Sequence, residues 1–529
     1  MDFIEKHRPD ITGTLSGLDR LILHGTIRFL AYAGGLFRLM CEMGVLLKQF
    51  GEFAEGETKK LLEATKAEAA RLGRPLIYLG SSSVRKDRCA LEIAAKDKIQ
   101  KGLICTLTAV EPCWSYDVHG SKARGKLEVR RRQRKCLHIY RYLLHPTFGF
   151  MHVRLQTWFP MALQVYINGR EWLARQMDAA GLGYLRKENC FLALDAPERA
   201  QQLMSDQLKT NWEGAMNEFA VQANPLLPHY SSFIPMGYYW SVHQSEWATD
   251  IMFKSREALA RLYPNLVHHG IKTFKSPDAM RFLGLHVTAS GQPHHNFKGE
   301  VVSDLKHRPE GVRLKHMVAG NSIKLYDKQG SVLRVETTIN SVRGFKAFRR
   351  PEQRPGGGSG RQAKAGGPCW MPMRRGVADL HRRTEISDAS NRRYLEALAS
   401  VEHTATLQEL ARPLCEPARL AKRPVRALNP LSPKDARLLE FVGRPEFAIA
   451  GLRNGDLRQE LFPRSDSPKE QKRHAAVAGR QLRLLRAHGL LARVPKTHRY
   501  TVTSKGRDAI SALLTARNAS VEALTRMAA

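Results

Sequence analysis

The sequence predicts an α+β protein of several domains, in which a body of antiparallel sheet and helices precedes a small basic C-terminal domain. Three observations predict this class. The 529 residues are too many for a single hydrophobic core. Hydrophobic residues make up 43% of the chain, which favours folded domains over a disordered basic tail. Helical and alternating apolar patterns also follow one another along the chain.

The formal net charge of +34, from 84 Lys and Arg against 50 Asp and Glu, predicts a polyanionic partner. Nucleic acid is the commonest cellular polyanion, so we expect DNA as the partner, with RNA as the alternative. A generally basic composition without such a partner is the competing interpretation. The oligomeric state is not indicated.

Location follows from what the sequence lacks. No window approaches the roughly 18 consecutive apolar residues of a membrane span. The start, 1–6, opens with acidic residues and does not resemble a secretory signal. None of the eight cysteines forms a C-x-x-C pair, so we expect reduced core thiols. A cytoplasmic protein with no membrane partner is therefore expected.

The first predicted region, 1–118, mixes helices and strands. Residues 17–51 carry helical apolar spacing, and 55–72 form an amphipathic helix that Gly73 ends. A strand at 75–80, a helix at 90–98 and a strand at 102–110 should follow.

The second region, 119–195, opens with a basic arm. Residues 122–135 hold eight positive charges and one negative charge, which predicts an exposed hairpin or loop that contacts phosphates. A solvated loop without a partner is the alternative. The expected phosphate contacts are Arg130, Arg131, Arg132, Arg134 and Lys135.

Aromatic and basic residues then interleave over 138–159. Met151, Val153 and Leu155 alternate with polar residues that include Arg154, which predicts a strand with one core face. The other face would stack bases and grip phosphates through Arg154. Alternatively, the aromatic residues belong to the core of the sheet.

The third region, 196–350, is predicted to be mainly helical over 196–260 and to have β character over 271–340. A helix would bring Glu246 and Asp250 to one face. Three antiparallel strands are expected at 312–318, 322–326 and 332–339. A Gly/Pro-rich linker with one helix then occupies 351–431.

The last region, 432–529, contains a succession of two helices, a basic helix at 468–488, a hairpin at 490–502 and a closing helix. Residues 432–517 resemble a winged-helix DNA-binding domain. The resemblance implies that the basic helix enters the major groove while the hairpin touches phosphates, although winged helices also bind proteins. The implied DNA contacts are Lys472, Arg473, Arg480, Arg483, Lys496 and Arg499.

Acidic residues stand within the predicted strands of the third region. Asp304, Asp327 and Glu336 would converge on one face and hold Mg²⁺ or Mn²⁺ against a scissile phosphate. The alternative is that each acid is an ion-pair partner, because basic residues flank them.

The strand Lys324-Leu-Tyr-Asp-Lys328, followed by Leu333-Arg-Val-Glu336, resembles strands of rolling-circle replication initiators and their relaxase-like relatives. The resemblance implies a DNA nickase with a bound divalent metal and a tyrosine nucleophile. The expected catalytic residues are Asp304, Tyr326, Asp327 and Glu336, with Tyr326 or a metal-activated water attacking phosphorus. The His-hydrophobic-His metal motif of that class is absent.

The sequence therefore leads to one main functional hypothesis and one rival. The main hypothesis is a metal-dependent nuclease of a mobile genetic element, which nicks, recombines or initiates replication of DNA. The rival is a non-catalytic protein that binds DNA or structured RNA. The residues leave open whether the chain is an enzyme.

Overall fold

The structure is a computed structural model, and it describes most of the chain. The described residues are 2–81, 83–121, 125–285, 287, 288, 297, 299–350, 368–399, 407–420, 423–444, 447, 451–494 and 497–520. Parts of three sequence-based predictions lie outside them, namely the arm residues 122–124, the linker residues 351–367 and the wing residue Lys496.

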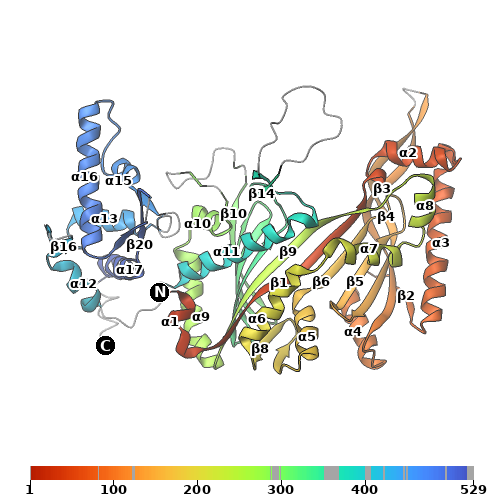
Figure 1. Cartoon of the computed structure of the whole chain (residues 1–529), viewed down its shortest axis with the longest axis horizontal. Coiled ribbons are helices and arrows are strands. Elements are labelled where there is room, and N and C mark those ends of the chain that lie inside the picture. Colours follow the sequence, from red (N-terminus) through yellow and green to blue (C-terminus); the bar gives the residue numbers. More distant parts are fainter. Residues whose placement is uncertain are drawn as a thin grey trace. The chain divides into compact units, whose positions relative to one another are not determined.

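The chain has an α+β multidomain architecture, as the sequence predicts, built around an eleven-stranded sheet (Figure 1). The strand order is β10-β11-β12-β13-β9-β1-β6-β5-β4-β3-β2, and β2 runs parallel to β3. The strands are β1 (Ile11–Ile27), β2 (Leu76–Tyr78), β3 (Gly102–Ser121), β4 (Lys126–His145), β5 (Gly149–Gln156), β6 (Leu163–Asn168), β9 (Tyr238–Phe253), β10 (Val301–Arg308), β11 (Gly311–Val318), β12 (Asn321–Lys328) and β13 (Val332–Ile339).

Two compact units divide the chain. Residues 13–250 and 338–388 form one unit, and residues 1–12, 251–337 and 389–529 form the other. Strands β1, β9 and β13 each pass without interruption from one unit into the other. The strands predicted for regions 1–118, 119–195 and 196–350 all join the same sheet, so the core does not follow those boundaries.

Helices of the first unit accompany the strands from β1 to β6. They are α2 (Ala33–Glu42), α3 (Phe50–Arg71), α4 (Lys86–Lys96), α5 (Gly169–Ala179), α6 (Pro197–Asp206), α7 (Trp212–Ala223) and α8 (Leu227–Phe233), together with the small hairpin β7 (Tyr184–Lys187) and β8 (Cys190–Leu194). The short strands β14 (Lys346–Arg349) and β15 (Cys369–Pro372) pair with each other in the same unit.

In the second unit, one core joins sheet and helices. Leu314, Leu325 and Leu333 from the strands pack with Leu262 and Tyr394 from helices. The helices of this part are α1 (Phe3–Lys6), α9 (Arg256–Lys272), α10 (Ser276–Phe282) and α11 (Leu380–Leu398), of which α11 begins in the other unit.

A separate hydrophobic core holds the C-terminal module. Its three-stranded sheet has the order β18-β20-β19. The elements are α12 (Leu407–Cys415), β16 (Ala418–Leu420), β17 (Arg423–Val425), α13 (Pro433–Val442), β18 (Leu452–Arg453), α15 (Asn454–Leu461), α16 (Pro468–Ala487), β19 (Leu491–Arg493), β20 (Arg499–Val502) and α17 (Ser504–Asn518). The predicted order of helices and hairpin is therefore present.

Two helical predictions are wrong where long strands occur. Residues 17–51 were expected to be helical, but β1 continues to Ile27, with Leu15, Leu21 and Leu23 alternately buried, and the helix α2 begins only at Ala33. Similarly, β9 replaces the helix expected around Glu246. Leucines spaced three residues apart fit the period of a helix. Pairing with neighbouring strands instead makes this segment a strand, in which every second side chain is buried.

No described helix is both long enough and apolar enough to cross a membrane.

Candidate metal centre

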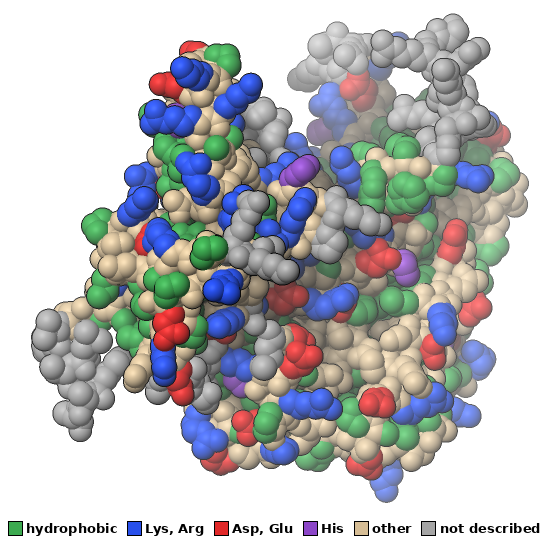
Figure 2. Space-filling view, turned by 60° about the vertical axis from the view of Figure 1, so that its left-hand side comes forward, with side chains coloured by type: hydrophobic (Ala, Val, Ile, Leu, Met, Phe, Trp, Pro, Cys, Tyr) green, Lys and Arg blue, Asp and Glu red, His purple; other side chains and the backbone are tan. Residues whose placement is uncertain are grey.

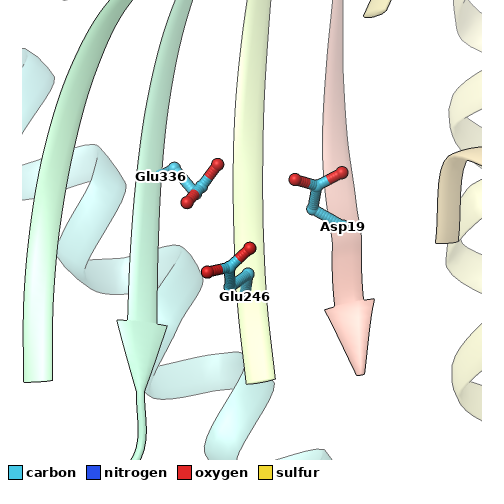
Figure 3. A group of neighbouring side chains, drawn as sticks. All are labelled: Asp19, Glu246 and Glu336. Carbon is cyan, nitrogen blue, oxygen red and sulfur yellow. The ribbon is translucent and has the colours of Figure 1, made fainter. Parts of the chain in front are cut away.

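Three buried carboxylates lie together on neighbouring strands of the large sheet. Asp19 on β1, Glu246 on β9 and Glu336 on β13 each offer an oxygen, and these oxygens lie within 4.8 Å of one another. The side chains point toward one another across the three strands (Figure 3). The residues are only 3%, 4% and 4% exposed, respectively. We call Asp19, Glu246 and Glu336 the acid cluster.

Strand pairing positions the acid cluster. The order β13-β9-β1 places the three strands side by side, about 4.8 Å apart, so carboxylates from adjacent strands can meet. The hydroxyl of Thr338, two residues after Glu336 on β13, donates to Glu246 Oε1 at 3.3 Å. That bond ties β13 to β9 beside the cluster.

Polar side chains hold each carboxylate. Arg20 Nε lies 3.6 Å from Glu246 Oε2, and Gln244 Nε2 donates to Glu246 Oε1 at 3.0 Å. Lys324 Nζ forms a close ion pair with Glu336. Asn189 Nδ2 donates to Asp19 Oδ1 at 2.6 Å from the turn between β7 and β8. These contacts fix the carboxylates before any ligand arrives.

The charges of the site leave room for a cation. Three carboxylates face two cationic partners, Arg20 and Lys324, so these five side chains sum to −1 at neutral pH (2 − 3). Close carboxylates in a buried site repel one another. Carboxylate oxygens are the ligands that hard divalent cations prefer. The acid cluster therefore has the donor set and the charge to hold a divalent ion.

A tyrosine stands at the edge of the site. Burial raises the pKa of Tyr166 on β6, Arg20 opposes that rise through charge and a hydrogen bond, and Asp19 and Glu246 reinforce it. Its ring also stacks on His152, with ring centres 5.2 Å apart. Tyr166 is thus electrostatically coupled to the acid cluster.

Of the three acids predicted from sequence, the structure brings only Glu336 into the cluster. Asp304 lies on β10, three strand spacings or about 14 Å from β13, and accepts two hydrogen bonds from Arg313 at 3.0 and 3.2 Å. Asp327 follows Tyr326 on β12 and therefore points to the opposite face from Lys324 and Tyr326. A shared site for Asp304, Asp327 and Glu336 is ruled out by this geometry.

The surroundings of Asp327 and Tyr326 differ accordingly. Burial raises the pKa of Asp327. Burial also raises the pKa of Tyr263 on α9, and the charge of Asp327 adds to that rise. Tyr326 shares the face of Lys324 and Glu336 and is 7% exposed, with Lys328 Nζ 5.1 Å from its ring centre.

The predicted basic arm is a β-hairpin, which confirms one of the two expected forms. Strands β3 and β4 pair as far as Ser121 and Lys126, and β4 beyond His138 toward the tip pairs with β3 alone. In this ribbon Arg130, Arg132 and Arg134 alternate with Arg131 and therefore share one face. Arg130, Arg131, Arg132 and Lys135 are exposed, and Arg134 is half-buried.

The aromatic strands behave differently from the arm. Tyr140 and Tyr142 are 6% and 2% exposed and pack with Ala90 of α4, so they belong to the core. Arg154 is half-buried, and its Nη1 lies 3.5 Å from Glu111 Oε2. The interpretation as core residues is therefore confirmed for Tyr140 and Tyr142, while base stacking by the other aromatic residues of this segment stays a prediction.

Cations line one side of α16 in the C-terminal module. Lys472, Arg473, Arg480 and Arg483 are exposed and lie within about 100° of the helix circumference, while Leu482 is buried. Figure 2 shows Lys and Arg side chains along this helix and, among acidic and apolar side chains, over the rest of the visible face. Arg499 on β20 is exposed as well.

Sequence reasoning missed Asp19 and misplaced Glu246. Both belong to long strands whose leucine or aromatic spacing imitated helices, and neither stands in a recognisable motif. A signal was present in β1, where Asp19 occupies a position in the buried alternation of Leu15, Leu21 and Leu23. An acid at a core position of a strand is a candidate for function or ion pairing.

Comparison with known proteins adds no identification, because no family model, curated protein or solved structure matches the chain significantly.

Proposed function

We propose that this protein binds nucleic acid and that its acid cluster holds a divalent cation for phosphodiester cleavage. The observation that carries the proposal is the meeting of Asp19, Glu246 and Glu336 within 4.8 Å in a chain of net charge +34. Three buried carboxylates suit a hard cation, and the cationic excess suits a polyanionic substrate.

A divalent ion at the cluster would polarise a phosphoryl oxygen and neutralise charge that develops during cleavage. The protein residues have separate tasks. Asp19, Glu246 and Glu336 would hold the ion, while Arg20 and Lys324 orient two of those carboxylates. The neutral donors Asn189, Gln244 and Thr338 would fix the remaining oxygens.

The resemblance of 324–336 to rolling-circle initiators favours strand nicking as the reaction. Lys324 and Glu336, two residues of that resemblance, are the ion pair beside the cluster. The C-terminal module supports DNA as the partner, since its helix and hairpin order fits a winged helix and α16 carries an exposed cationic side. In this proposal the module binds DNA and the body cuts it.

The proposal is tested with supercoiled plasmid and the full chain in millimolar Mg²⁺ or Mn²⁺. We expect metal-dependent nicking by the native protein and a loss of at least about 100-fold in Asp19→Asn, Glu246→Gln and Glu336→Gln, since a metal contributes several kcal/mol to such a transition state. Asp327→Asn is the matched control, because Asp327 points to the opposite face of the sheet from Lys324 and its partner Glu336. It should nick normally.

Two further readouts separate catalysis from binding. Mg²⁺ or Mn²⁺ should raise the Tm of the native protein and of Asp327→Asn but not of Glu336→Gln. All variants should bind DNA in EDTA. Tight binding without any cleavage by the native protein in either metal would remove the catalytic part and leave the rival, a non-catalytic nucleic-acid-binding protein.

A further inference from the structure

A row of charged side chains leads away from the acid cluster across β13, β12, β11 and β10. Lys324 on β12 forms an ion pair with Glu336 on β13. On β11, Lys315 lies directly opposite Lys324, and on β10, Asp304 lies directly opposite Lys315. Residues directly opposite each other in antiparallel strands point to the same face. Asp304, Lys315, Lys324 and Glu336 therefore form one line, which we call the charged row.

A second line on the same face adds two cations. Lys306 on β10 lies opposite Arg313 on β11, which lies opposite Tyr326 on β12. The two lines together hold four cations, Lys306, Arg313, Lys315 and Lys324, against two carboxylates, Asp304 and Glu336. These six side chains sum to +2 (4 − 2).

The carboxylates are already engaged with other cations. Asp304 accepts both bonds from Arg313 and lies 3.4 Å from Lys306 Nζ. Glu336 is paired with Lys324. Within the described part of the chain, Lys315 has neither a hydrogen bond nor an ion pair.

Lys315 is therefore a half-buried ammonium group among like charges. Burial lowers its pKa, the neighbouring charges of Lys324 and Arg313 lower the pKa further, and the charge of Asp304 opposes this shift only in part. Nearby, Arg313 Nε is buried and meets no acceptor among the described residues. A cation held in this way destabilises the fold unless an anion joins it.

We propose that Lys315, with Arg313 and Lys306, forms a phosphate subsite for the nucleic-acid strand that enters the acid cluster. The subsite lies two strand spacings, about 10 Å, from Glu336. Long cationic side chains can reach from there toward a phosphate next to the one at the cluster. The inference rests on the proposed function, because it assigns the subsite to the same nucleic-acid substrate.

Stability provides a test that does not depend on catalysis. Lys315→Met keeps the aliphatic stem and removes the unpaired charge, so we expect a Tm equal to or above that of the native protein. A structural ion-pairing role would instead make this variant less stable. A lower Tm for Lys315→Met than for the control Lys272→Met, an exposed residue at the end of α9, overturns the inference.

Binding provides the decisive test. The probe is a fluorescent single-stranded DNA oligonucleotide, titrated in EDTA into the full chain at several salt concentrations. We expect Lys315→Met to weaken binding about tenfold at low salt, from the loss of one charge-assisted contact, and to reduce the slope of log affinity against log salt by about 0.7. Lys315→Arg should retain most of the affinity, and Lys272→Met should behave like the native protein.

The outcomes separate this inference from the proposed function. If the native protein binds the oligonucleotide and Lys315→Met binds equally well with the same slope, the subsite is wrong while the proposed function stands. If the native protein binds no oligonucleotide, the proposed function is wrong, and the inference that rests on it is overturned as well. A second experiment uses inorganic phosphate as the probe. If phosphate raises the Tm of the native protein but Lys315→Met does not change oligonucleotide binding, the site binds a free anion and the inference is overturned.

Discussion

Buried charges in this protein fall into two kinds, and Arg170 illustrates the structural kind. Arg170 Nη2 lies 2.8 Å from Asp250 Oδ2, both side chains are fully buried, and the same nitrogen donates to the Ala248 carbonyl at 3.1 Å. A protein carboxylate therefore pairs the charge of Arg170. Lys315 differs, since its neighbours are mainly cations. A buried charge suggests a ligand when the protein itself does not pair it.

The ion pair between Arg170 and Asp250 predicts the effect of substituting Arg170 on stability. Arg170→Met leaves the Asp250 carboxylate buried without its guanidinium, and we expect a loss of about 3–5 kcal/mol of unfolding free energy. Urea denaturation of the full chain measures this loss. The double variant Arg170→Met/Asp250→Leu should lose less than the single variant, because no charge is left stranded. Equal losses in both would show that packing, rather than the ion pair, dominates at this position.

At the scale of elements, the β3–β4 ribbon presents its arginines in a defined pattern. Arg132 pairs with Asp117, Arg130 Nη2 lies 3.1 Å from Glu128 Oε2, and Arg134 lies 4.1 Å from the centre of the Trp158 ring. Exposed ion pairs of this kind are weak and exchange readily for phosphate. The ribbon can therefore contact a nucleic-acid backbone.

The arm prediction concerns salt. Arg130→Ala/Arg132→Ala/Arg134→Ala should lower the slope of log affinity for duplex DNA against log salt by roughly 2 to 3, from about 0.9 per phosphate contact. Fluorescence anisotropy at several salt concentrations measures it. A triple variant with the same charge change on an exposed side of α3, Lys59→Ala/Lys66→Ala/Arg71→Ala, is the control. An identical slope in the arm variant would place the phosphate contacts elsewhere.

Helix α16 provides the comparison with the arm. Because a major-groove helix requires a duplex, Lys472→Ala/Arg480→Ala/Arg483→Ala should weaken binding to duplex DNA more than binding to a single strand. The arm variant should affect both. Equal effects of the α16 variant on both substrates would argue that this helix does not enter a groove.

The whole molecule should lose stability in mild acid. Burial lowers the pKa of His138 and of His316 from 6.5 to about 4, and the residues are 2% and 1% exposed. Between pH 6.5 and about 4 the unfolded chain therefore binds protons that the folded chain does not. The contribution of these two histidines to the free energy of unfolding is fully present above pH 6.5. It is lost as the pH falls through this window, by at most about 1.4 kcal/mol per pH unit for each histidine.

Thermal unfolding at pH 7, 6 and 5 checks this expectation. The Tm should fall across the series, and His138→Gln/His316→Gln should show a shallower dependence on pH than the native protein, whatever its absolute stability. A variant with the native pH dependence would assign the acid sensitivity to other groups.

Local patterns predicted several elements well. The alternation of Met151, Val153 and Leu155 gave a strand with one buried face, and β5 has it. The Ser-Pro start at 432 predicted the beginning of α13, where the Ser432 hydroxyl accepts from the Asp435 amide. Such signals act through the neighbouring residues, so a single sequence contains them.

The sequence by itself determined the charge, the α+β class, the basic hairpin, the strands at 312–339 and one member of the site, Glu336. Only the tertiary structure decided that β1 and β9 are strands and that Asp19 and Glu246 join Glu336, while Asp304 and Asp327 do not. The physical reason is that a cluster of side chains from several strands of a sheet depends on strand order and register. Both are fixed by long-range pairing between segments more than 200 residues apart in the chain, such as β1 and β9, and no local pattern records such pairing.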